Sequence, residues 1–347
     1  MLRLRNVVRI AVLTGALMLV AGPAQAVRFK MATVAPEGSQ WMLDLQAGAQ
    51  EIKRRTEGRA TFKFYGGGVM GNDKKVLRKI RIGQLHGGVF TANGLSERYR
   101  DIVIYGLLML FRSQDEVDYV RERMDPILKN GLSEAGFASF GFAGGGFAKL
   151  MGNEPVTRLE DLRGRKVWVP EGDRITYESM EVLELAPVVL PITDVLTGLQ
   201  TGLLEYIATP PVGAIVLQWY TKVKYVTAYP FAYTLSALVI DQRAFGRLSE
   251  ADRAVVTEVF TGVYAAFEKQ SHVDNRLAEE ALKSNGLQFV ELDESLVPSW
   301  RVLLTDASHR MASEGVFSMA ILDRLLAHLE EFRSAAGETQ AAARVSE

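Results

Sequence analysis

Residues 27–34 read VRFKMATV and residues 60–65 read ATFKFY, two short runs in which apolar and polar side chains alternate as in β-strands. Between them, residues 39–56 carry apolar side chains at helical spacing. A further helical stretch at 74–82 and an apolar run at 86–91 complete a strand–helix–strand–helix–strand order. This order is typical of an α/β fold in which helices cover a sheet.

The same alternation begins again after residue 135. Strand patterns occupy residues 137–142, 147–151, 166–169 and 188–190, and helical patterns occupy residues 175–185 and 193–200. We therefore predict two α/β lobes, with lobe I at residues 27–148 and lobe II at residues 149–234.

The chain then returns to lobe I at residues 235–285. This segment holds a strand pattern at 236–240 and a helical stretch at 249–284, for which Ser249 is the expected N-cap. A helix of that length would run about 50 Å at 1.5 Å per residue, so we expect it to brace both lobes. We expect residues 286–334 to form a C-terminal helical segment packed on the lobes, and residues 335–347 to form a flexible tail.

The N-terminus has the three parts of a secretory signal. Arg3, Arg5 and Arg9 precede an uncharged apolar run at residues 10–21, and the small residues Ala24 and Ala26 follow. The run is short for a membrane span, which needs about 20 residues. We predict cleavage after Ala26 and a periplasmic protein that does not span the membrane.

Composition excludes several functions. Without the signal the chain has 37 basic and 41 acidic residues, a mildly acidic balance that argues against a nucleic-acid partner. The chain has no cysteine and only four histidines, none paired at metal-ligand spacing. No P-loop and no G-x-S-x-G motif occurs. We therefore assign no catalytic residues, metal ligands or cofactor, and predict a binding protein rather than an enzyme.

Two glycine clusters follow strand patterns, at Gly66–Gly68 and Gly144–Gly146. Neither has the spacing of a dinucleotide-binding loop. We expect both to form loops at strand ends, which is where ligands sit in open α/β sheets.

Five segments, in order, resemble the substrate-binding subunit of tripartite ATP-independent periplasmic (TRAP) transporters, the DctP-type family. They are residues 31–38 (MATVAPEG), 58–71 (GRATFKFYGGGVMG), 155–170 (PVTRLEDLRGRKVWVP), 199–210 (LQTGLLEYIATP) and 222–226 (KVKYV). The third is similar to the family pattern DLKGLKIRVP, and the fourth to LQTGVVDGQENP.

The resemblance implies a two-lobed periplasmic binding protein fold with crossing strands and a long bracing helix. It also implies that the lobes close on a small organic solute by a hinge motion, and that the small and large membrane subunits of a TRAP transporter then receive the solute. We expect a monomer.

The chain departs from the family where the carboxylate-anchoring arginine of IRVP is expected, because Trp168 stands there. An indole cannot form the two parallel hydrogen bonds that a guanidinium gives a carboxylate. The ligand is then either a less charged or aromatic relative of an organic acid, or an acid bound by another cation such as Lys149 or Arg174.

The expected ligand-binding residues come from both lobes, at strand ends or at positions that match the family. They are Glu37, Trp41, Asn72, Phe90, Thr91, Asn93, Trp168, Glu171, Tyr206, Thr209 and Phe231.

Two other functions fit the same sequence. The first is a periplasmic binding protein that reports to a sensory receptor instead of a transporter. The second is an exported enzyme on a similar two-lobed fold, which would need an acid–base pair in the cleft.

Overall fold

The structure is a computed structural model that describes residues 26–345. The predicted signal peptide, residues 1–26, lies outside the described residues apart from Ala26. Nine strands are present in the described part of the chain: β1 Val27–Ala32, β2 Ala60–Tyr65, β3 Gly87–Thr91, β4 Phe137–Gly152, β5 Lys166–Pro170, β6 Ala186–Leu190, β7 Tyr206–Thr209, β8 Tyr225–Asp241 and β9 Gln288–Val290.

The helices alternate with these strands as the sequence predicts. The α-helices are α2 Gln40–Arg55, α3 Asp73–Arg81, α4 Ala92–Leu95, α5 Gln114–Glu134, α6 Arg174–Val182, α7 Val195–Thr201, α8 Pro211–Val216, α9 Gln242–Phe245, α10 Glu250–Ser284, α11 Val297–Ser313 and α12 Met319–Val345. The 3-10 helices are η1 Arg100–Gly106, η2 Leu159–Leu162, η3 Ile192–Asp194, η4 Trp219–Lys222 and η5 Glu294–Leu296.

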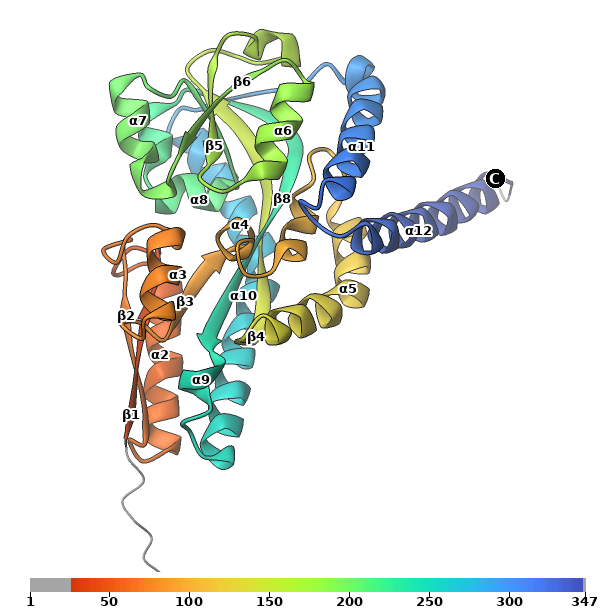
Figure 1. Ribbon diagram of the computed structural model, residues 1–347. Coiled ribbons are helices and arrows are strands. Elements are labelled where there is room, and N and C mark those ends of the chain that lie inside the picture. The colour runs from red at the N-terminus through yellow and green to blue at the C-terminus, as the bar shows by residue number, and fades with distance from the viewer. Residues whose placement is uncertain (1–25, 346–347) are drawn as a thin grey trace, which may run out of the picture.

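All strands belong to one sheet that passes through two lobes (Figure 1). Its order is β2-β1-β3-β8-β4-β7-β5-β6, with β9 beside β8. Lobe I holds the parallel strands β1, β2 and β3, and lobe II holds the parallel strands β5, β6 and β7. The long antiparallel strands β4 and β8 cross between the lobes.

The predicted domain limits fall inside the crossing strands. Residues 148 and 149 lie in β4, and residues 234 and 235 lie in β8. Because both strands serve both lobes, the exact limits remain a prediction.

The prediction of a loop at Gly144–Gly146 is wrong. Instead of two strands separated by glycines, β4 is a single strand whose register against β8 shifts at these residues. A Cβ atom on Gly144 would lie 1.8 Å from the Tyr233 hydroxyl oxygen, and Gly146 has a φ of +91°. Glycine is needed here because the two crossing strands and their side chains approach too closely for any side chain.

Helix α10 confirms the predicted long helix. It has 35 residues, and the Ser249 side chain accepts a hydrogen bond from the N–H of Asp252 at the N-terminus. Its first half packs Val256 and Phe260 into the core of lobe I, and Leu282 near its end packs into lobe II. A single rigid element therefore contacts both lobes.

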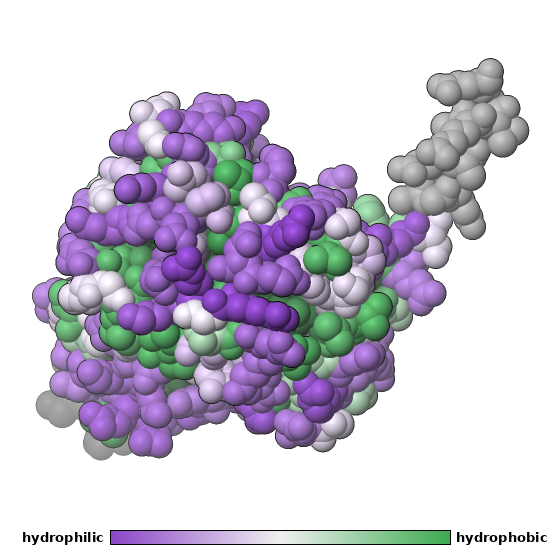
Figure 2. Space-filling view, turned by 90° about the horizontal axis from the view of Figure 1, so that it is seen from above, coloured by the Kyte–Doolittle hydropathy of each residue, from purple (hydrophilic) through white to green (hydrophobic). Residues whose placement is uncertain are grey.

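Each lobe buries apolar side chains on both faces of its half of the sheet. In lobe I, α5 and α12 cover one face and α2 with α10 the other. In lobe II, α6 and α11 cover one face and α7 with α8 the other. Figure 2 shows hydrophilic side chains over most of the face seen from above, with apolar side chains in smaller groups between them.

Helix α12 extends into the segment where the sequence predicts a flexible tail from residue 335, and that expectation stays a prediction. Across residues 26–345, no helix combines the length and the apolar character that crossing a membrane requires.

Candidate functional site

A cavity of about 1120 Å³ lies between the two lobes and is lined by residues of both. This volume slightly exceeds the roughly 300–1,000 Å³ of most ligand pockets. The walls come from the ends of strands β3, β5 and β7, from the crossing strands, and from helices α2, α4, α6 and α10. Most of the lining side chains are apolar or aromatic.

The structure brings together nine of the expected ligand-binding residues in the wall of this cavity. They are Trp41, Asn72, Phe90, Thr91, Asn93, Trp168, Glu171, Thr209 and Phe231.

Glu37 and Tyr206 do not line the cavity. The Glu37 carboxylate accepts the backbone N–H of Gly66 at 3.2 Å and supports the loop after β2. Tyr206 is 3% exposed, and its hydroxyl donates to the carbonyl of Glu154 at 3.4 Å. Tyr206 alternates with its neighbours along β7, so its ring points into the lobe II core instead of the cleft.

Two amide–carboxylate hydrogen bonds join the lobes at the edge of the cavity. The Asn72 side chain, at the N-cap of α3 in lobe I, donates to Glu171 Oε2 of lobe II. The Asn93 side chain of α4 donates to Asp173 Oδ2 at 2.9 Å. Since both bonds span the cleft, they hold the lobes together in the conformation described here.

Two aspartates at these contacts, the half-buried Asp73 and the buried Asp173, have raised pKa values. Burial raises the pKa of Asp73 from 3.8 to about 6; the hydrogen bond from Thr91 partly opposes the rise, and the Glu171 carboxylate adds to it. Burial also raises the pKa of Asp173, although Thr176 and Asn93 donate hydrogen bonds to it. Sequence reasoning missed both residues, since each looks like an ordinary helix-start residue.

Trp168 lies in the wall but has no free donor. Its indole N–H donates to the carbonyl oxygen of Leu190 at 2.9 Å, and its ring packs edge-on against Trp219 with 5.2 Å between ring centroids. The side chain therefore offers a ligand an apolar surface only.

The two cations considered as replacements for the missing arginine do not line the cavity. Lys149 pairs with Glu279 at 2.5 Å, and Arg174 pairs with Glu178 and with Glu314. Among the described residues of the lining there is no arginine, and Lys74, which is exposed, is the one lysine.

Polar side chains of α10 hold the glycine segment of β4, and Gly144, Gly145 and Ser271 themselves line the cavity. Glu268 Oε2 accepts the N–H of Gly144 at 2.6 Å, Ser271 donates to the Gly144 carbonyl, and Asn275 donates to the Gly145 carbonyl at 2.8 Å. These residues share one helix face, because they are spaced i, i+3 and i+7. Sequence reasoning missed them, although a polar stripe inside a long helix was a usable signal.

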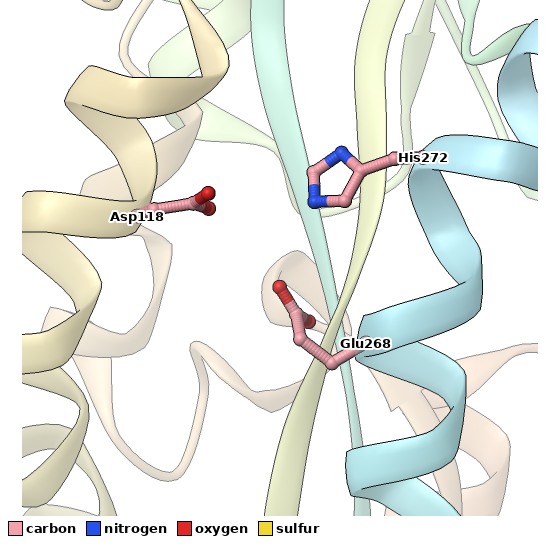
Figure 3. Close-up of side chains that lie close together, drawn as sticks. All are labelled: Asp118, Glu268 and His272. Atoms are coloured by element: carbon pink, nitrogen blue, oxygen red, sulfur yellow. The ribbon is translucent and has the colours of Figure 1, made fainter.

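Glu268 also belongs to a group that could hold a metal ion. Figure 3 shows Asp118 on α5 pointing toward Glu268 and His272 on α10, and their ligand atoms lie within 4.8 Å of one another. Both oxygens of Glu268 are already occupied, one by the Gly144 N–H and the other by Arg121. The group therefore fits a role in the hinge better than metal binding.

The fold combines two α/β lobes, two crossing strands, a bracing helix and a cavity between the lobes. This combination defines a protein that captures a ligand by closing. The comparisons with known proteins agree. The sequence profile of the family described as bacterial extracellular solute-binding protein, family 7 (DctP), matches residues 31–314. The chain belongs to this family of solute-binding proteins, and the predicted TRAP-type substrate-binding subunit is confirmed.

Three relatives illustrate the similarity. The C4-dicarboxylate-binding periplasmic protein DctP of Rhodobacter capsulatus is 22% identical over 273 residues, which cover 75% of this chain and 79% of that protein. A solute receptor of Bordetella pertussis that binds pyroglutamic acid has a TM-score of 0.80 at 18% identity and covers 88% of this chain and 100% of its own.

A TRAP periplasmic solute-binding protein of Ochrobactrum anthropi, with its C-terminus bound in the ligand pocket, has a TM-score of 0.76 at 24% identity. That match covers 91% of this chain and 99% of the other. These likenesses confirm the two-lobed fold.

Proposed function

We propose that this chain captures a small organic solute between its lobes by hinge closure and delivers it to the membrane subunits of a TRAP-type transporter. The observation that carries the proposal is the cavity of about 1120 Å³, which is lined by both lobes and has hydrogen bonds between the lobes at its edge. The nine lining residues predicted from the sequence, with Asp73 and Asp173, form the proposed ligand-binding set.

The proposal includes the route to the periplasm. Cleavage after Ala26 would release a chain that starts at the first residue of β1. We propose that the released protein is monomeric and docks on a small and a large membrane subunit after closing.

The ligands of the relatives suggest a solute class. By their names, the relatives bind C4-dicarboxylates, pyroglutamic acid and, in a Xanthobacter autotrophicus protein, β-D-galacturonate, all of which are organic acids. In this chain the cavity lacks a buried arginine among its described lining residues. The solute is therefore either an organic acid that is bound without a guanidinium group, or a less charged relative of such an acid.

Closure can be measured directly because the chain contains no cysteine. Arg81→Cys on α3 and Glu181→Cys on α6 place spin labels at exposed positions on opposite lobes. We expect a solute that raises the melting temperature of the mature protein to shorten the distance between the labels. A solute that binds without changing this distance would contradict the closing mechanism.

The two other functions give different results. An exported enzyme would convert the bound solute, which mass spectrometry of the solute after incubation would detect. A sensory binding protein would fail to drive uptake in vesicles that contain the TRAP membrane subunits, whereas the proposed function requires uptake there.

A further inference from the structure

Carboxylates dominate the charged groups around the cavity. The lining contains six acidic side chains and one lysine among the described residues. The acidic residues are Asp44, Asp73, Glu97, Glu171, Asp173 and Asp274. The lysine, Lys74, is exposed and forms no ion pair in the described part of the chain. A wall of this charge repels anionic solutes and attracts cationic ones.

Asp73 and Glu171 are the two of these carboxylates that lie at the contact between the lobes, and each keeps one oxygen without a hydrogen-bond partner among the described residues. Glu171 accepts from Asn72 through Oε2, and Asp73 accepts from Thr91 through Oδ2 at 3.3 Å. Neither the second oxygen of Glu171 nor that of Asp73 has a hydrogen-bond partner among residues 26–345. The two side chains come from opposite lobes, and the Glu171 charge is close enough to influence the pKa of Asp73.

Among its described lining residues the cavity offers no buried cation to an anionic solute. The indole N–H of Trp168 is not available to a ligand, because it donates to the carbonyl oxygen of Leu190. Arg121 does not line the cavity, and it donates to Asp125 and Glu268. A carboxylate ligand would therefore be desolvated without the charged, bidentate donor that makes such burial favourable.

The remaining wall is apolar and deep. Aliphatic side chains line it where the cavity enters lobe II: Leu159, Leu162, Met180, Leu183 and Leu185. Aromatic rings also line it, from Trp41 on α2, Phe90 on β3 and Phe231 on β8. A hydrocarbon or aryl group gains about 25 cal/mol for each Å² that it buries against such walls, and aromatic faces also attract an ammonium group.

We propose that the solute is an organic cation with an ammonium group between Asp73 and Glu171 and an apolar body against the aliphatic wall of lobe II. This inference rests on the proposed capture of a solute between the lobes, and it replaces the organic-acid class that the ligands of the relatives suggest. It is carried by the cavity between the lobes and its apolar wall as well as by the charges.

Matched solutes test the charge. Titration calorimetry of the mature protein compares three phenyl compounds with chains of equal length: 3-phenylpropylammonium, 3-phenylpropanol and 3-phenylpropanoate. The ammonium compound is expected to bind at least about tenfold more tightly than the alcohol, because a charge-assisted hydrogen bond contributes about 1.5–3 kcal/mol and each 1.4 kcal/mol is tenfold. The carboxylate is expected to bind weakest.

Glu171→Gln tests the position. It removes the charge but keeps an oxygen that can accept the Asn72 hydrogen bond. The variant is expected to lose about tenfold in affinity for the ammonium compound while its affinity for the alcohol changes less than about twofold. Glu181→Gln, an exposed position of lobe II outside the lining, is the matched control and should leave both affinities unchanged.

The outcomes separate this inference from the proposed function. Tighter binding of the alcohol or the carboxylate overturns the cation and leaves solute capture intact. If Glu171→Gln loses the same affinity for the ammonium compound and for the alcohol, the placement of the ammonium group beside Glu171 is overturned. If none of the three compounds binds, the inference fails, and the spin-label distance in the presence of solute retained from the periplasm decides independently whether the cleft captures anything.

Discussion

Two groups of charged side chains differ in how far the protein satisfies them. Arg121 is surrounded by hydrogen-bond partners, whereas the carboxylates Asp73 and Glu171 in the cavity wall are not. Arg121 is 6% exposed, yet it donates to Asp125 at 3.0 Å, to Glu268, to the Tyr233 hydroxyl at 3.2 Å and to the Phe142 carbonyl at 3.3 Å. Burial alone would lower the pKa of Arg121, but Asp125, Tyr233 and Glu268 raise it above its usual value. In the cavity, Asp73 and Glu171 instead keep free oxygens.

The comparison distinguishes charged groups that are fully paired within the protein from charged groups that can still bind a ligand. A buried ion with every donor used stabilises the hinge and has nothing left to bind. A half-buried carboxylate with one free oxygen lowers the free energy of unfolding of the ligand-free protein. A ligand that binds this oxygen in the folded state raises the free energy of unfolding again. The following predictions test this distinction, from the largest expected effect to the smallest.

Arg121→Met should destabilise the protein most. It leaves Asp125 and Glu268 without their buried counter-charge, and breaking a buried pair typically costs about 3–5 kcal/mol. Urea unfolding followed by circular dichroism measures the loss. Arg81→Met on α3, an exposed position, is the control and should change stability by less than about 0.5 kcal/mol. A loss for Arg121→Met as small as the control's would show that the network carries no energy.

Asp73→Asn should stabilise the ligand-free protein at neutral pH. The pKa of Asp73 rises from 3.8 to about 6 on folding, so its ionised form is disfavoured in the folded state. The stability linked to this group is complete below pH 3.8 and is lost as the pH rises through 6. The difference is at most about 3 kcal/mol, at 1.36 kcal/mol per pKa unit.

Urea unfolding at several pH values checks this sign. The variant should exceed the natural chain in stability at pH 7 and match it near pH 4. A variant that is less stable at pH 7 would mean that Asp73 is compensated within the protein, as Arg121 is.

Asn93→Ala should open the cleft. It removes a hydrogen bond to the buried Asp173 carboxylate, and bonds to charged groups contribute about 1.5–3 kcal/mol. Because this bond exists only when the lobes meet, the expected effect is a longer distance between labels at positions 81 and 181. Asn130→Ala, which removes an exposed bond to Glu134 within α5, should leave the distance unchanged. An unchanged distance in Asn93→Ala would rule out this bond as a latch.

Trp168→Phe should have the smallest effect. The variant loses the hydrogen bond to Leu190, at about 1 kcal/mol, and keeps an apolar ring in the wall. Titration calorimetry should give nearly the same affinity for the ammonium compound as in the natural chain. A tenfold loss would assign Trp168 a direct contact with the charged group of the ligand.

Local patterns predicted much of the fold. The capping of α10 by Ser249 and the alternation of β1 follow from side chains close together in the sequence. The prediction failed at Gly144–Gly146, because glycines favour a loop unless contacts from other elements fix them in a strand. Here the pairing with β8 and the hydrogen bonds from Ser271 and Asn275 of α10 fix them.

The candidate site was predictable by position but not by chemistry. Strand ends and family-like positions located nine residues of the cavity wall, since ligands gather at the ends of sheet strands. Glu37 was misplaced because the direction of a side chain in a loop depends on its hydrogen bonds, here with Gly66. The direction of the Trp168 N–H likewise depends on Leu190 of the neighbouring strand.

The sequence by itself determined the order of strands and helices, the long bracing helix and the absence of cysteine, because these depend on composition and on neighbours within a few turns. The tertiary structure decided which charges meet. Asn72 reaches Glu171 and Asn93 reaches Asp173 across 99 and 80 residues of chain, and Arg121 reaches Glu268 across 147. Such contacts are set by how the crossing strands bring the lobes together, and no local pattern of side chains encodes that arrangement.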